Sequence, residues 1–132
     1  MQVEGTPNGV PVRVRSAGGD PVGAAATAAA AVMTLTLTSD PNRRTKLKGI
    51  VIDGLGATAA SVIEATVTGL VGGTMRLKVA VPAGATTAIA RVAELFGDGI
   101  PASGDDVDIV VSVPSFGAGN TSAVAYAWGC ID

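Results

Sequence analysis

Residues 74–81, with the sequence Thr-Met-Arg-Leu-Lys-Val-Ala-Val, decide the fold class. Successive side chains of a β-strand point to opposite faces of a sheet, so a period of two in hydrophobicity predicts a strand with one buried face. This stretch has that period without interruption. Its alternating apolar residues are Met75, Leu77, Val79 and Val81, and the residues between them include Thr74, Arg76 and Lys78.

The same period recurs on both sides of this stretch, at residues 33–37, 45–53, 63–67, 107–113 and about 120–129. Residues 63–67 and 75–81 are joined by a glycine-rich connection of hairpin length, residues 69–73, so we expect these two strands to pair antiparallel. Residues 40–42, Asp-Pro-Asn, predict a turn. Pro114 ends a strand, because proline cannot donate to the hydrogen-bond ladder.

One segment, Thr86 to Phe96, fits two structures. Ile89, Val92 and Phe96 have helical spacing, whereas the position of the segment between strands favours another strand, which we expect. With this segment the chain has seven or eight short strands at regular intervals. The pattern predicts an all-β fold, specifically an antiparallel β-sandwich of the jelly-roll type.

Residues 1–31 differ from the rest, because a short alternating piece leads into a Gly/Ala tract that ends at Ala31. The alanines of residues 24–31 have helix propensity, but the run has no polar face and is short for an isolated helix. We therefore expect an extended N-terminal arm or a loosely attached edge strand. The predicted organisation is an arm over residues 1–31 and a β-sandwich domain over residues 32–132. The alternating piece consists of Val10, Val12, Arg13, Val14 and Arg15.

The composition limits the possible partners. The chain has 132 residues, the length of one domain, and is 48% hydrophobic, 15% charged and only 3% aromatic. A net charge of −2 and too few rings to stack on bases disfavour nucleic-acid binding. No apolar run approaches the roughly 20 residues of a membrane helix, and the first residues lack the basic region of a signal peptide. We expect a soluble protein, with no membrane partner, made in the cytoplasm.

Few side chains suit catalysis. The chain has no histidine, the commonest general base and a common zinc ligand, and its single cysteine, Cys130, cannot form an internal disulfide. Serines are present, but no recognisable neighbouring base would activate them. Glu64 and Glu94 are the candidates for a glycosidase-like carboxylate pair, and one of them alternates outward from its strand while the other lies in the ambiguous segment. We therefore expect no enzymatic activity and no cofactor.

Two motifs allow both a functional and a structural interpretation. Residues 54–59, Gly-Leu-Gly-Ala-Thr-Ala, follow an apolar strand and match a dinucleotide-binding pattern. The next segment alternates as a strand, and no acidic residue stands at the required distance, so we interpret these residues as a turn. Asp105, Asp106 and Asp108 could offer oxygen ligands to Ca²⁺, but they lack the spacing of an EF-hand loop, and we interpret them as a solvated turn.

Several stretches between about Arg44 and Gly129 combine a strand with a glycine- or proline-rich turn. They are KLKGIVIDGLGATAA (46–60), ATVTGLVGGT (65–74), VAVPAGAT (79–86), Ile100-Pro101-Ala102-Ser103 after Phe96, and VPSFGAGNTSA (113–123). Together with the opening NGVPVRV (8–14), they resemble a group of small bacteriophage virion proteins of the capsid decoration or head-fibre type. The ending Trp128-Gly129-Cys130 differs from the aromatic or small ending usual in that group.

The resemblance implies a capsid decoration (cement) protein on the virion surface, a jelly-roll homotrimer that binds the major capsid protein lattice and stabilises the head. We expect residues 1–31 and the basic group, Arg43, Arg44, Lys46 and Lys48, to contact the capsid. A solvated strand edge guarded by lysine is the structural alternative for the basic group. The alanine face of the last strand, Ala123, Ala125 and Ala127, permits close approach of a second sheet or a neighbouring subunit, and we expect it at a subunit interface.

A receptor- or carbohydrate-binding module of a head or tail fibre is the alternative function. Such a module predicts a concave site lined by aromatic rings. The chain has four aromatic residues in all, Phe96, Phe116, Tyr126 and Trp128, and this small number counts against it.

Overall fold

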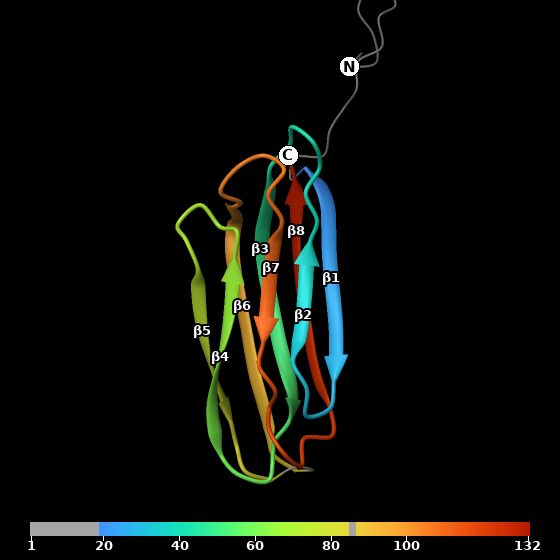
Figure 1. Ribbon diagram of the computed structural model, residues 1–132, viewed down its shortest axis with the longest axis vertical. Coiled ribbons are helices and arrows are strands. Elements are labelled where there is room, and N and C mark those ends of the chain that lie inside the picture. The colour runs from blue at the N-terminus through green and yellow to red at the C-terminus, as the bar shows by residue number, and fades with distance from the viewer. Residues whose placement is uncertain (1–18, 85–86) are drawn as a thin grey trace, which may run out of the picture.

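The computed structural model describes residues 19–84 and 87–132. Within these residues the regular secondary structure consists of β-strands alone. The strands are β1 (Asp20–Ala28), β2 (Met33–Leu37), β3 (Thr45–Leu55), β4 (Ser61–Thr68), β5 (Met75–Val81), β6 (Ile89–Pro101), β7 (Ile109–Val113) and β8 (Ala123–Ile131). They form two four-stranded sheets, with the strand orders β1-β8-β3-β6 and β2-β7-β4-β5, which face each other as two layers (Figure 1). All pairings between these strands are antiparallel, so the predicted all-β antiparallel fold is confirmed.

The alternating stretches form strands as predicted. β4 and β5 pair antiparallel across the glycine-rich connection, from Ser61↔Val81 to Val67↔Met75. The ambiguous segment contributes to β6, an edge strand paired with β3. Val92 and Phe96 both pack against the core from β6, because positions two and four residues apart share a face of a strand. Their spacing, which also fits a helix, is therefore satisfied by a strand.

The Gly/Ala tract is extended rather than helical. Its first part is β1, an edge strand that pairs with β8 from Asp20↔Ile131 to Ala28↔Ala123. β1 falls within the range that the sequence assigns to an arm, and it is part of the first sheet. The predicted contact residues Val10, Val12, Arg13, Val14 and Arg15 lie outside the residues that the structure describes.

The core lies between the two sheets and is almost entirely aliphatic. The inner face of β8 consists of alanines, and β8 packs against β2 of the other sheet. Small side chains on a central strand let the opposite layer come close, and larger residues on the other strands and in the connection after β7 fill the remaining space. These larger buried residues include Leu35, Leu37, Leu47, Ile50, Ile52, Val67, Val79, Val111, Val113 and Phe116.

The strands run alternately up and down in Figure 1, so the connections gather at two ends of the sandwich. The connections after β2, β4 and β6 lie at what we call the upper end, together with the start of β1 and the end of β8. The connections after β1, β3, β5 and β7 lie at the lower end.

Buried Asn120 joins the connections after β1 and β7 to the end of β3 at the lower end of the sandwich. Its Nδ2 donates to the carbonyl oxygens of Leu55 (2.6 Å) and Ser122 (3.0 Å), and its Oδ1 accepts from the backbone N–H of Ala30 (2.9 Å). The side chain thus ties together backbone groups of three segments, and the Ser122 carbonyl oxygen also accepts from the N–H of Leu55 (2.9 Å).

The stretch that matches the dinucleotide pattern also lies at the lower end. Gly54 and Leu55 complete β3, and the next element is the strand β4 rather than a helix. The N–H of Gly56 donates to the carbonyl oxygen of Ala88, and a Cβ atom at Gly56 would collide with the carbonyl oxygen of Pro82. Gly56 therefore serves a close backbone crossing, in agreement with the interpretation of these residues as a turn.

Candidate contact surfaces

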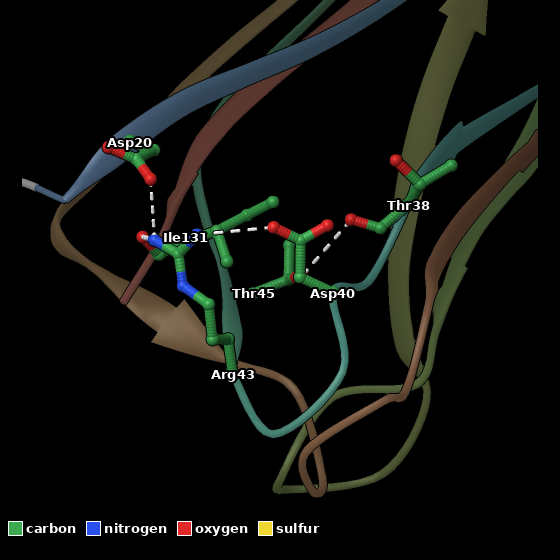
Figure 2. A network of polar contacts seen from close by, with 6 residues as sticks. All are labelled: Asp20, Thr38, Asp40, Arg43, Thr45 and Ile131. Atoms are coloured by element: carbon green, nitrogen blue, oxygen red, sulfur yellow. Dashed lines mark hydrogen bonds and ion pairs between the residues drawn. The ribbon is translucent and has the colours of Figure 1, made fainter.

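Arg43, the first member of the basic group, holds the upper end of the sandwich together (Figure 2). Its Nη2 donates to Asp20 Oδ2 (2.7 Å) and to the carbonyl oxygen of Ile131 (2.8 Å), and its Nη1 donates to Asp40 Oδ2 (3.1 Å). The hydrogen bond with Asp20 is the main cause that raises the pKa of Arg43 above its usual value. One guanidinium thus joins the first residue of β1, the connection after β2 and the end of β8.

Two other members of the basic group also have acidic partners within the chain. Arg44 Nε lies 3.8 Å from Asp105 Oδ1, and Lys46 Nζ lies 2.5 Å from Asp132 Oδ2. The hydrogen bond with Asp132 is the largest cause that raises the pKa of Lys46. Lys48 makes no ion pair with any of the described residues. The basic group is therefore largely neutralised by aspartates, and it is not a positively charged patch.

The structure brings the basic group next to the point where residues 1–18 join the sandwich. The ion pair of Arg43 with Asp20 establishes this proximity, because Asp20 opens β1. Asp20, which belongs to the range predicted as an arm, therefore lies beside the basic group.

The third candidate region is not on the surface. Ala123, Ala125 and Ala127 are at most 1% exposed and face the second sheet. The sequence allows two roles for this alanine face, contact with a second sheet or with a neighbouring subunit. In the structure it contacts the second sheet. These three side chains are consequently unavailable for contact with another subunit.

The opposite side of β8 lies on an exposed, largely apolar sheet surface, which we call the aromatic face. Residues paired in register across antiparallel strands point to the same side of a sheet. The register across β1, β8, β3 and β6 places three rows there: Gly23, Trp128, Gly49 and Leu95; Ala25, Tyr126, Val51 and Ala93; and Thr27, Val124, Asp53 and Arg91.

Two aromatic rings form the centre of this face. Tyr126 and Trp128 are stacked, with ring centroids 5.7 Å apart and an angle of 22° between the planes. They line an open groove of about 520 Å³ together with residues of β1 and the end of β8, namely Pro21, Val22, Gly23 and Gly129. On the far side of the face, Leu95 of edge strand β6 is 77% exposed. The face thus has a groove at one edge and a protruding leucine at the other.

The outer surface of the second sheet has the opposite character, and we call it the polar face. Its registered residues include Thr34, Thr36, Thr66, Thr68, Ser112, Glu64, Arg76 and Lys78. Glu64 accepts from Arg76 Nη1 and Lys78 Nζ, each at 2.6 Å. These two contacts, of which the one with Lys78 is the larger cause, lower the pKa of Glu64. Only one of the two outer sheet surfaces is therefore apolar.

The remaining candidates for chemistry have structural roles where the structure describes them. Asp105 pairs with Arg44, and Asp108 Oδ1 accepts from the backbone N–H of Ser39 (2.7 Å). No group of three or more metal-binding side chains gathers among residues 19–84 and 87–132. Cys130 is a free thiol and only 4% exposed.

The aromatic face is the feature that the sequence did not identify as a contact surface. Alternation in residues 120–129 places Val124, Tyr126 and Trp128 on one side of the strand, and this division is correct. Large apolar side chains ordinarily face the core, whereas here the alanines do. The signal that could have identified it is a last strand with alanines on one side and aromatic residues on the other. If the alanine side chains of such a strand face the core, its aromatic side chains must be exposed.

No protein-family model, curated protein or solved structure matches this chain. Among the residues that the structure describes, there is no helix that could cross a membrane.

Proposed function

We propose that this chain is a bacteriophage capsid decoration protein that binds the major capsid protein lattice as a homotrimer and stabilises the head. The proposal starts from the virion-protein resemblance of residues 44–129. The virion surface is the location that this function requires.

We also propose that the fold is a jelly roll. A jelly roll has eight strands in two sheets, and the orders β1-β8-β3-β6 and β2-β7-β4-β5 support it, because each sheet takes strands from both halves of the chain. Jelly rolls occur in viral capsid proteins, lectins and cupins. Of these classes, the viral one agrees with the resemblance.

The observation that carries the capsid proposal is the ion pair between Arg43 and Asp20. It holds the start of β1, where residues 1–18 join the sandwich, beside the basic group. A chain segment and a sandwich end can then act as one contact region. An extended segment can add a strand to a neighbouring sheet, with alternate side chains in pockets. Many weak contacts of this kind suffice on a repetitive lattice, because multivalent binding raises the overall affinity.

The contact region acts through its shape and its attached segment more than through net charge. Three of the four basic side chains are already paired with aspartates. Binding that depended on long-range attraction would weaken strongly with salt, because exposed charges are screened beyond about 10 Å at 0.1 M. We therefore expect capsid binding to decrease little between low and moderate salt.

The proposal is tested by adding the purified protein to capsids that lack it and imaging the particles. Regular density at fixed lattice positions, and survival of the heads at a higher temperature, are the expected results. A chain that begins at Gly19 should lose binding while keeping its fold. Arg76→Ala, on the polar face, is the matched control and should bind as the wild type does. Capsids that acquire no density at any protein concentration would refute the proposal.

The fibre-module alternative requires a sugar site. The groove beside Tyr126 and Trp128 has the rings for such a site, but its only side-chain hydrogen-bonding group in addition to the indole N–H is the Tyr126 hydroxyl. Sugar recognition needs several such polar groups, since unpaired hydroxyls lose their hydrogen bonds to water. Decoration is therefore the function that we propose.

A further inference from the structure

We infer that the aromatic face is the surface through which copies of this chain associate, with edge strand β6 of one copy lying in the groove between β1 and β8 of the next. The inference deepens the self-association part of the proposed function and does not depend on capsid binding. Its occupant is a second copy of the same chain.

The exposure of large apolar side chains is the first argument. Leu95 is 77% exposed and Tyr126 is 44% exposed, and both point from the aromatic face in the same direction. The polar face bears hydroxyl and charged side chains at its corresponding central positions. Large apolar side chains gathered on one face of a protein are typical of a protein-protein contact.

The positions of the groove and of Leu95 are the second argument. The groove lies at the β1 edge of the sheet, and Leu95 lies at the β6 edge. A protrusion and a groove at opposite edges of one face are complementary, and in a heterologous contact each copy gives its protrusion to one neighbour and receives that of another. Such contacts close into rings when the rotation between copies allows it, which agrees with a trimer.

Charge is the third argument. The three rows of the aromatic face contain only two charged residues, Asp53 and Arg91, which are opposite in sign and adjacent in register. Among the residues that the structure describes, neither makes an ion pair, whereas Glu64 on the polar face makes two. The face therefore has no net charge that would repel a second copy. Its two charges are also open to partners on a neighbouring chain.

The size of the face limits the strength of a single contact. Four strands spaced about 4.8 Å apart, at roughly 3.3 Å per residue for nine residues, cover roughly 600 Å². In the edge-in-groove arrangement each copy divides this face between two neighbours, so one contact buries roughly 600 Å² in total, less than the roughly 1,200 Å² of a stable isolated pair. Closing the ring adds a further contact for every copy, so we expect the ring to be more stable than a single pair.

The first test is the mass of the full chain in solution, measured by light scattering during size-exclusion chromatography without capsids. We expect an oligomer for the wild type and a shift to monomer for Leu95→Lys. Val62→Lys is the matched control. Val62 is also a branched aliphatic side chain on a strand and is 66% exposed, but it lies on the outer side of β4. It should remain oligomeric. A monomeric wild type at high concentration, or equal loss of association in both variants, would overturn the inference.

Cysteine crosslinking tests the arrangement itself. Ala25 lies opposite Tyr126 beside the groove and is exposed, and the native Cys130 is buried. Under mild oxidation the variant carrying both Ala25→Cys and Leu95→Cys should form covalent dimers and larger species, while each single variant should not. Efficient crosslinking of Leu95→Cys alone would show face-to-face packing of the β6 edges and would overturn the edge-in-groove arrangement.

These results are separable from the capsid experiment. An oligomer that depends on Leu95 but ignores capsids would support this inference and refute the decoration function. A chain that is monomeric in solution but occupies capsid sites would support capsid binding and refute this inference.

Discussion

The indole ring of Trp128 lies over Gly49, its cross-strand partner on β3, and fills the space that a side chain at Gly49 would need. A Cβ atom there would overlap with ring atoms Cζ2 and Cη2. Gly49 is therefore what allows a large ring to lie flat on the sheet and form one wall of the groove.

Gly49→Ala should displace the Trp128 ring and destabilise the fold by about 1–3 kcal/mol, the usual cost of forcing extra volume into a packed position. Trp128 is the only tryptophan in the sequence, so its fluorescence reports the displacement directly. Gly72→Ala is the control, because nothing lies within 4 Å of the added carbon. Unchanged emission and melting temperature in Gly49→Ala would contradict the observed ring position.

Ala125→Leu should destabilise the sandwich by about 1–3 kcal/mol or more, since the Ala125 side chain is fully buried between the sheets and the extra carbons have no space. Denaturant unfolding measures the change. Ala80→Leu, at an exposed position on β5, should change the free energy of unfolding little. If both substitutions had equally small effects, the close approach of the sheets at β8 would be in doubt.

Asn120→Ala should cost about 1–3 kcal/mol, because it removes the buried side chain that bonds the carbonyl oxygens of Leu55 and Ser122 and the N–H of Ala30. Hydrogen exchange should increase at the Ala30 amide in particular. Thr121→Ala, at the exposed neighbouring position, serves as the comparison. Slow exchange at Ala30 in Asn120→Ala would mean that its N–H has another acceptor.

The ion pairs of Glu64 predict a pH dependence of stability. The pKa of Glu64 is lowered in the folded state, chiefly by the hydrogen bond from Lys78, so its contribution is present above its unfolded pKa and is lost as the pH falls through the folded value. Glu64→Gln should therefore melt at a slightly lower temperature than wild type at neutral pH, and the difference should vanish in acid. A difference that stays constant from neutral to acidic pH would rule out this ion-pair origin.

The sequence predicted most strands because alternation is a local property. The pattern at residues 75–81 and the glycine-rich connection before it were sufficient for the hairpin of β4 and β5. Alternation also assigned Tyr126 and Trp128 to one side of the last strand. It could not determine which side is buried, since that depends on how much space the opposite sheet leaves.

Contacts between residues far apart in the sequence could not be predicted. The basic group looked like a contact surface because four basic residues stand within positions 43–48, and only Asp40 among their acidic partners is a near neighbour in the sequence. Its neutralising partners include Asp20 and Asp132, which the fold brings to Arg43 and Lys46 from the two ends of the described chain. The pairing of β1 with β8 is of the same kind. The tract before residue 31 therefore resembled a separate arm, although residues 20–28 complete a sheet.

The central position of β8 in the first sheet has a consequence for how the molecule forms. β1 and β3 are not neighbours, and each pairs with a side of β8. While the chain is being synthesised, β1 has no partner in its sheet until β8, the last of the described strands, has been made. The first sheet is therefore completed late, through contacts with large sequence separation, which are slow to form. During this interval the free edges of β1 and β3 can pair with other chains. A high concentration of newly made chains would therefore favour misassembly until β8 has completed the sheet, and misassembly should be rare after that.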